Sequence, residues 1–157
     1  MTRVLFVCTG NICRSPTAEG VFRALIERAG VANRISCDSA GTHGYHIGEP
    51  PDLRTQHAAR RRGYNLGNLR ARCIDHSDFR DFDLMLAMDL ENLAALSHMQ
   101  PRDARITPAL FLDYAGHPEL HEVDDPYYGG PGGFEAVLDV VEDAAARLLV
   151  SLTAAKT

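Results

Sequence analysis

The chain has 157 residues, 45 % of them hydrophobic and 24 % charged, a balance typical of a single folded domain spanning residues 1–157. Its 21 acidic and 16 basic residues give a net charge of −5, which argues against nucleic acid as a partner, because binding nucleic acid normally requires a basic face. No apolar run approaches the roughly 20 residues of a membrane span, and the short one near the N-terminus ends at a turn, so we expect a cytoplasmic chain without membrane insertion.

Strand-like and helix-like segments alternate from the start of the chain. Residues 4–7 form a continuous apolar run, typical of a buried parallel strand. A helix is expected next, with Ser15 as its N-cap and Pro16 in its first position. Apolar residues at i, i+3, i+4 spacing follow, and Gly30 ends the helix. A second short strand is expected over residues 34–42.

The alternation continues through the rest of the chain. The expected elements are a loop rich in Gly and Pro over 43–52, a helix over 53–62, a third strand over 81–89, a short fourth strand or strand-like stub over 104–112, and a last helix over about 134–154. Asp89 should cap the helix after the third strand, and Glu19 with Arg23 should form a surface ion pair at i, i+4 spacing. Such alternation predicts an α/β fold with a parallel sheet covered on both faces. Ligands of these sheets bind at the carboxyl ends of strands, where Cys8 falls.

The turn after the first strand has the sequence CTGNICRS, which is the pattern C-x5-R followed by serine. A turn of this size at a helix N-terminus can point several backbone N–H groups inward as a nest for an anion. Gly10 and Asn11 tolerate the left-handed backbone angles that a nest needs. Arg14 adds a planar fork that matches two phosphate oxygens, and the same positive field favours the thiolate of Cys8. The pattern therefore predicts a phosphate-binding loop with Cys8 as a nucleophile.

The four cysteines call for different interpretations. They contain no CxxC pair and form no disulfide framework, so free thiols in a reducing compartment are expected. A cysteine at a strand end is usually a small core residue, but the fixed offsets around Cys8 favour function. Cys37 and Cys73 lack such a context and are predicted to fill the core. Cys13 either lines the loop or forms a reversible disulfide with Cys8 under oxidation.

The segments VLFVCTGNICRSPTAE and DPYYGG resemble the low-molecular-weight protein tyrosine phosphatases, and DSAGT, GYHIGEPPD, ARCI and DFRDFDLMLAMDLENL follow in that family's order. The resemblance covers nearly the whole chain. It implies a four-stranded parallel sheet with helices on both faces and catalysis without a metal or other cofactor. It also implies hydrolysis of phosphotyrosine in proteins, and of small aryl phosphates, through a phosphocysteine intermediate. The implied partner is a phosphotyrosine-containing protein, for which a bacterial-type tyrosine kinase is one candidate.

Carried over to this chain, the resemblance makes Cys8 the nucleophile, Arg14 the residue that grips the phosphoryl group and Asp125 the general acid. It also implies that Asn11, Ser15 and Ser39 hold the loop and tune the thiolate. The residues expected to contact the substrate are Thr9, Gly10, Asn11, Ile12, Cys13, Ser15, Tyr45, His46, Tyr127 and Tyr128.

A carboxylic acid is also what the chemistry requires. The leaving oxygen must be protonated as the P–O bond breaks, and the same group can then act as a base on the water that hydrolyses the phosphocysteine. Asp124 competes for this role. Asp125 is favoured because it directly precedes Pro126, as in the family motif.

Two pairs of aromatic side chains are candidates for the walls of the site. Tyr127 and Tyr128 either pack in a loop or form one wall of a slot for a flat phenyl ring, and the resemblance favours the wall. Tyr45 and His46 would form the opposite wall and vary the choice of substrate.

Three other functions are alternatives. An arsenate reductase on a similar scaffold would need a further cysteine pair, for which only Cys37 and Cys73 are available. Protein-arginine phosphatases tend to carry threonine where this chain has Ile12, and they lack paired tyrosines after Asp-Pro. A module that only binds phosphate would need neither a reactive thiol nor Asp125.

Overall fold

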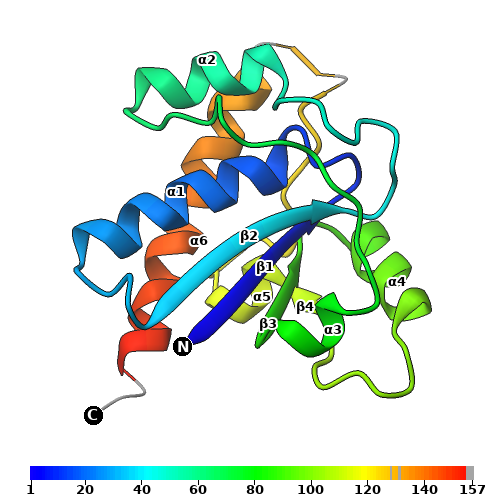
Figure 1. Ribbon diagram of the computed structural model, residues 1–157. Coiled ribbons are helices and arrows are strands. Elements are labelled where there is room, and N and C mark those ends of the chain that lie inside the picture. Colours follow the sequence, from blue (N-terminus) through cyan, green and yellow to red (C-terminus); the bar gives the residue numbers. More distant parts are fainter. Residues whose placement is uncertain (128, 131, 155–157) are drawn as a thin grey trace.

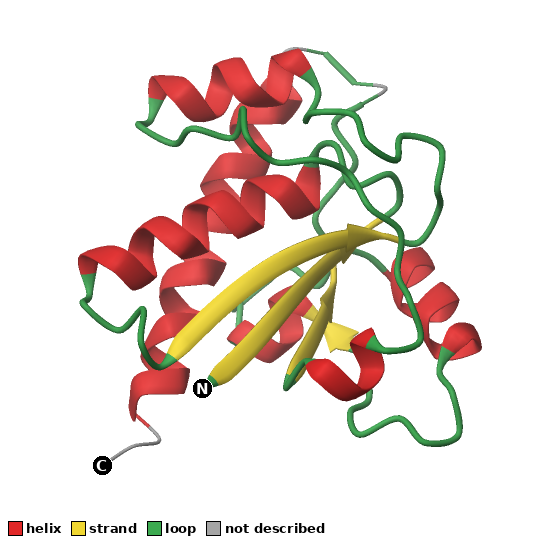
Figure 2. Cartoon of the chain, viewed as in Figure 1, coloured by secondary structure: helices red, strands yellow, loops and turns green. Residues whose placement is uncertain are grey.

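The computed structural model of the chain, which describes residues 1–127, 129–130 and 132–154, has a central sheet with helices on both faces (Figure 1, Figure 2). Its strands are β1 (Thr2–Cys8), β2 (Ile35–Gly41), β3 (Leu84–Ala87) and β4 (Ala109–Leu110). Its helices are α1 (Arg14–Arg28), α2 (Leu53–Arg61), α3 (Asp78–Asp81), α4 (Leu90–Met99), α5 (Phe111–Ala115) and α6 (Gly132–Ala154). The strand order is β2-β1-β3-β4 and all paired strands are parallel. The predicted α/β fold with a four-stranded parallel sheet is confirmed.

Strand β1 lies inside the sheet and sends successive side chains to opposite faces. Val4 and Phe6 belong to one hydrophobic cluster, whereas Leu5 and Val7 belong to the other, and all four side chains are fully buried. Because both faces are covered, the run is apolar throughout instead of alternating with polar residues.

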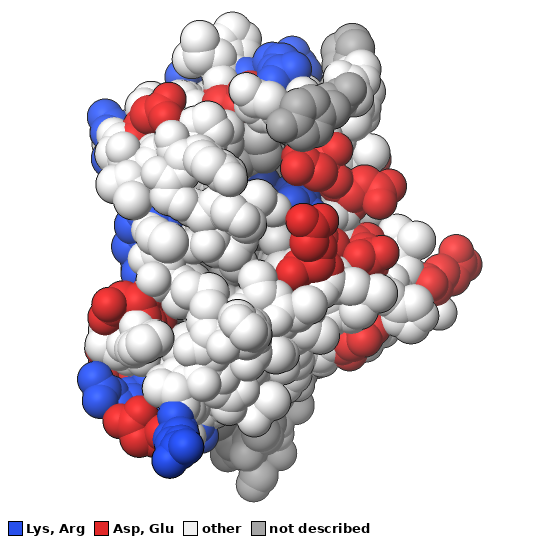
Figure 3. Space-filling model, turned by 90° about the vertical axis from the view of Figure 1, so that its right-hand side faces the viewer, with Lys and Arg blue, Asp and Glu red and all other residues white. Residues whose placement is uncertain are grey.

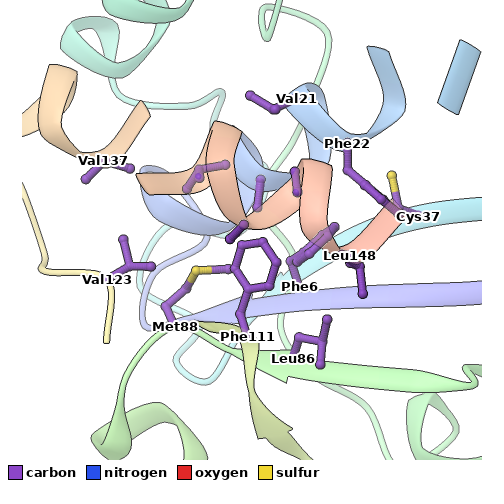
Figure 4. Packing of buried hydrophobic residues seen from close by; sticks show 14 of the residues in the cluster. Phe6, Val21, Phe22, Cys37, Leu86, Met88, Phe111, Val123, Val137 and Leu148 are labelled. Carbon is purple, nitrogen blue, oxygen red and sulfur yellow. The ribbon is translucent and has the colours of Figure 1, made fainter. Parts of the chain in front are cut away.

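The larger cluster lies between the sheet and helices α1, α5 and α6. The ring of Phe6 packs edge-on against Phe22 of α1 and Phe111 of α5, with centroids 5.7 and 5.1 Å apart (Figure 4). Phe79 of α3 and Leu96 of α4 belong to the smaller cluster on the opposite face. This packing fixes the carboxyl end of β1 between two layers of helices.

The start of α1 differs from the prediction. The helix begins at Arg14 with Cys13 in the N-cap position, so the prediction of Ser15 as the N-cap is wrong. Pro16 is the third residue of the helix. The first four N–H groups of a helix have no partner within it, so the N–H that proline lacks costs no hydrogen bond at this position. The hydroxyl of Ser15 points to the sulfur of Cys8 instead.

Two short helices were not predicted. Within the expected strand over 104–112, only the two residues of β4 form a strand. Phe111 and Leu112 continue the apolar run in the sequence, but they belong to helix α5, and their side chains are buried. Helix α3 spans four residues, too few for a recognisable helical pattern.

Ion pairs join the end of α2 to α6. Arg61 contacts Glu135 at 2.6 Å, and Arg62 contacts Glu135, Asp139 and Glu142 at 2.9, 3.0 and 2.5 Å. Four contacts to carboxylates of one helix fix the position of α2 beside the first turns of α6.

Within the described residues, no helix has the length and apolar character needed to cross a membrane.

Candidate active site

Most residues predicted to contact a substrate line one pocket at the carboxyl end of β1, with a volume of about 480 Å³. The predicted residues in its lining are Cys8, Thr9, Gly10, Ile12, Cys13, Arg14, Tyr45, His46, Asp125 and Tyr127. Asn11, Ser15 and Ser39 are buried behind the loop instead, and Tyr128 lies outside the described residues. Figure 3 views the molecule from this side and shows acidic side chains gathered on it. The positive charge available to an anion in the pocket therefore comes from inside, from Arg14, which is only 2 % exposed.

In the loop after β1, two carbonyl groups accept hydrogen bonds from neighbouring loops. The carbonyl oxygen of Thr9 accepts from the amide of His43 at 3.0 Å, and that of Ile12 accepts from the amide of Asp52 at 2.9 Å. The backbone N–H groups of residues 10–13 donate to no acceptor in the described part of the chain. Such a set of amides at the start of a helix is a nest for an anion.

One of the two residues that tolerate left-handed backbone angles adopts them. Asn11 has a φ of 58°, whereas Gly10 is not among the described residues with positive φ. Glycine at position 10 has a steric role, because a Cβ there would lie 3.1 Å from the ring of His46.

Arg14 is held from two sides so that its guanidinium faces the pocket. Its Nη1 donates to the carboxylate of Asp89 at 2.5 Å and to the carbonyl of Val123 at 3.0 Å. Its Nη2 lies 3.6 Å from Oδ2 of Asp125. Burial lowers the pKa of Arg14, but the charges of Cys8, Asp89 and Asp125 outweigh it and raise the pKa above its ordinary value. The result is a permanent, oriented cation that can bind two oxygens of one phosphoryl group.

A series of hydrogen bonds leads to Ser15 and allows it to donate to Cys8, whose Sγ lies 3.0 Å from the Oγ of Ser15. The amide of Arg72 donates to Oδ1 of Asn11 at 2.9 Å, which identifies the oxygen of this side chain. Nδ2 of Asn11 then donates to the hydroxyls of Ser15 and Ser39 at 2.8 and 2.9 Å. Because the oxygen of Ser15 already accepts a hydrogen bond from Asn11, its own hydrogen is available to the sulfur of Cys8.

This series of hydrogen bonds ends at Glu19, whose contribution to the site was not predicted. Ser39 donates to Oε1 of Glu19 at 2.7 Å and Arg23 donates to Oε2 at 2.6 Å. The predicted pair with Arg23 exists, but its placement on the surface is wrong because Glu19 is 4 % exposed. Burial raises the pKa of Glu19, although Ser39 and Arg23 oppose the shift. By binding the hydrogen of Ser39, Glu19 leaves the oxygen of Ser39 to accept from Asn11.

The second cysteine of the loop differs from the first in its environment. Burial raises the pKa of the Cys13 thiol to about 12, so Cys13 stays protonated near neutral pH although it lines the same pocket. Cys8, in contrast, lies beside Ser15 at the base of the nest. Away from the pocket, Cys37 is buried as predicted, whereas Cys73 is only half-buried.

The geometry favours Asp125 over Asp124 as the acid. Asp125 lines the pocket, its Oδ1 accepts from the amide of Tyr127 at 3.0 Å, and its side chain is 39 % exposed. Asp124 is exposed and is not among the described residues that line the pocket. Of the two neighbouring carboxylates, Asp125 is the one found in the described lining of the pocket.

Helix α4 contributes three residues to the site that sequence reasoning did not assign. Asp89 caps the helix, as predicted, by accepting from the amide of Asn92 at 2.7 Å, and it also binds Arg14. The side chain of Asn92 donates to the hydroxyl of Thr9 at 3.0 Å, and Glu91 lines the pocket. One signal was available for Asp89, since a cap residue directly after a strand lies at the ligand-binding edge of the sheet.

Comparisons with known proteins identify relatives of this chain. A family model described as low molecular weight phosphotyrosine protein phosphatase matches residues 3–157. The chain is 42 % identical to the low molecular weight protein-tyrosine-phosphatase YfkJ of Bacillus subtilis over 152 residues, which cover 97 % of this chain and 96 % of that protein.

Solved structures add two informative neighbours. The crystal structure of a protein tyrosine phosphatase from Entamoeba histolytica, with Hepes in its active site, has a TM-score of 0.92 and 38 % sequence identity, with 100 % of each chain covered. The crystal structure of a Drosophila arginine phosphatase has a TM-score of 0.88 and 34 % identity, covering 97 % of this chain and 98 % of that one.

Proposed function

The chain belongs to the low molecular weight phosphotyrosine protein phosphatase family, and we propose that it hydrolyses phosphotyrosine in proteins with Cys8 as nucleophile, Arg14 as phosphoryl-binding residue and Asp125 as general acid and base. One observation carries the assignment of roles. A cysteine, a buried arginine and a carboxylate line a single pocket next to a loop whose amides have no acceptor among the described residues.

In the first step, the thiolate of Cys8 attacks phosphorus and the bond between phosphorus and the phenolic oxygen breaks. Asp125 gives its proton to that oxygen, so the product leaves as a neutral phenol. The amides of residues 10–13 and the guanidinium of Arg14 bind the non-bridging oxygens of the transferred group. This step uses the protonated form of Asp125.

In the second step, Asp125 is a carboxylate and takes a proton from a water molecule that attacks the phosphocysteine. The bond between phosphorus and sulfur breaks, phosphate leaves, and Cys8 returns to its thiolate. The Oγ of Ser15 lies 3.0 Å from the sulfur of Cys8, and its hydrogen stabilises the charge that reappears on this sulfur. Asp125 regains the proton it needs for the next cycle.

The lining of the pocket supports an aryl phosphate as substrate. Tyr45, His46 and Tyr127 line the same pocket as Cys8 and Arg14, so they are available to contact a phenyl ring attached to the phosphoryl group. The physiological partner we propose is a phosphotyrosine-containing protein, with a bacterial-type tyrosine kinase as a candidate. The cytoplasm is the compartment we propose, because reducing conditions keep the thiol of Cys8 free.

A comparison of three substrates tests this proposal. We expect the wild-type protein to hydrolyse phosphotyrosine much faster than phosphoarginine and not to reduce arsenate, and Cys8→Ser to lose the phosphotyrosine activity. Faster turnover of phosphoarginine would place the chain with the Drosophila arginine phosphatase in function as well as in fold. Arsenate reduction would require a further reactive cysteine, and burial raises the pKa of Cys37 to about 12.

A substitution at Asp89 tests how Arg14 is oriented. Asparagine caps helices as well as aspartate does, so Asp89→Asn preserves the start of α4 and removes only the charge facing Arg14. Because a hydrogen bond to a buried charge is lost or weakened, we expect kcat/KM for an aryl phosphate to fall about 10- to 100-fold and inhibition by phosphate to weaken in parallel. Steady-state kinetics measure both, and a thermal melt checks the fold. Unchanged kinetics would mean that Arg14 is oriented without Asp89.

A further inference from the structure

A second pocket adjoins the active site along helix α2. Its volume is about 400 Å³, and the described residues that line it are Leu53, Arg54, His57, Arg61 and Phe134. Leu53 is 69 % exposed at the first position of α2. A large aliphatic side chain held open to solvent beside a pocket is a feature of surfaces that bind a partner. We call this site the α2 pocket.

Arg54 of the α2 pocket also contacts a residue of the active site. Its guanidinium lies against two rings, 5.2 Å from the centre of Tyr127 and 4.8 Å from the centre of Phe134. Two hydrogen bonds from Arg54 to the carboxylate of Asp52, at 3.0 and 2.9 Å, fix its orientation. Tyr127 lines the active site and Phe134 lines the α2 pocket, so the stack of rings and guanidinium is a common wall.

The common wall is narrow enough for one substrate segment to reach both pockets. Adding the two distances to the guanidinium shows that the rings of Tyr127 and Phe134 are at most about 10 Å apart. An extended chain advances about 3.3 to 3.6 Å per residue, so residues two apart are separated by about 7 Å, which lies within this limit. In an extended segment, side chains two residues apart point to the same side. We propose that the α2 pocket binds an apolar side chain two residues away from the phosphotyrosine of a substrate protein.

The charges around the α2 pocket favour an apolar occupant. Arg54 is paired with Asp52, and Arg61 is paired with Glu135 at 2.6 Å, so neither arginine is free to attract an anion. Their aliphatic stems, together with Leu53 and Phe134, offer apolar surface. No acidic residue is among the described lining of the pocket, so the ammonium group of a lysine would find no partner there. The inference rests on the proposed function, because phosphotyrosine in the active site positions the segment.

Phosphopeptides of matched sequence test the inference. They carry Leu, Gly or Lys two residues before or two residues after the phosphotyrosine, and kcat/KM is measured for each. We expect Leu at one of these positions to raise kcat/KM about ten-fold over Gly, as expected for burial of most of its side chain, and Lys to give no gain. In Leu53→Glu the ratio of Leu to Gly peptides should fall to about one. Glutamate is favourable in the first turn of a helix, so this change is compatible with folding.

A matched control is available on α6. Val150 is 65 % exposed and lies near the other end of that helix from Phe134, so Val150→Glu makes a comparable change away from both pockets. This variant should keep the ten-fold ratio. A ratio near one in the wild type, or an unchanged ratio in Leu53→Glu, would overturn the inference. Sedimentation showing a dimer that Leu53→Glu dissociates would also overturn it, since the α2 pocket would then bind a second copy of the chain.

Hydrolysis of p-nitrophenyl phosphate separates this inference from the proposed function. The small substrate fills only the active site, so its turnover by the wild type reports on Cys8, Arg14 and Asp125 without the α2 pocket. Wild-type turnover of p-nitrophenyl phosphate without discrimination among the peptides removes the inference alone. No wild-type turnover of p-nitrophenyl phosphate or any peptide removes the proposed function and the inference with it.

Discussion

Cys8→Ser is expected to abolish hydrolysis of aryl phosphates while leaving phosphate or vanadate binding intact. A serine hydroxyl is not ionised near neutral pH, so no nucleophile remains, and loss of a nucleophile typically costs on the order of 10⁴-fold or more in kcat. The anion-binding groups are separate from the sulfur, since they are the amides of residues 10–13 and the guanidinium of Arg14. Turnover of p-nitrophenyl phosphate measures the loss, and calorimetric titration with phosphate measures what is retained.

Cys13→Ser is the matched control for this experiment. Cys13 lines the same pocket, but burial raises the pKa of its thiol to about 12, and a protonated thiol is a poor nucleophile. We therefore expect Cys13→Ser to retain most of the activity. Equal losses in the two variants would indicate that the loop had collapsed, and full activity of Cys8→Ser would refute Cys8 as the nucleophile.

The parts of the fold that follow local patterns could be predicted from the sequence. The apolar run of β1, the periodic helices and the C-x5-R turn each depend on residues close together in the chain, and the structure has all of them. The errors occur where a contact with a residue distant in the sequence determines the local structure. Ser15 is a good cap by composition, but Cys8 lies 3.0 Å from its hydroxyl and the helix begins at Arg14. Phe111 continues an apolar run, yet it packs from a helix against Phe6.

The supporting residues of the site show the same limit. Asp89 reaches Arg14 across 75 positions of sequence, and Glu19 reaches Ser39 across 20. Nothing local distinguishes Glu19 from the exposed acid of an ordinary i, i+4 pair, because its burial is decided by β2 packing beside α1. The α2 pocket is a further case, since Phe134 and the residues of α2 meet only in the folded chain.

Asp125→Asn should produce the second-largest loss, one that depends on the leaving group. General acid catalysis contributes about 10²- to 10⁴-fold, so we expect kcat/KM for phosphotyrosine or phenyl phosphate to fall by that factor. Dinitrophenyl phosphate, whose leaving group needs no proton, should lose little. Comparison of kcat/KM across such a series isolates the first step, because the ratio includes no step after formation of the phosphocysteine. The side-chain oxygen of asparagine can still accept from the amide of Tyr127, so the geometry of the segment is retained.

Asp124→Asn provides the control, because it removes the same charge from the adjacent residue. Asp124 is exposed and absent from the described lining of the pocket, so its substitution should change kcat/KM less than about two-fold for every leaving group. The opposite pattern, with steep leaving-group dependence in Asp124→Asn and none in Asp125→Asn, would assign the acid to Asp124. Equal sensitivity in both variants would mean that the proton comes from neither carboxylate alone. Only leaving-group dependence confined to Asp125→Asn agrees with the position of this carboxyl, which lies 3.6 Å from Arg14 and lines the same pocket.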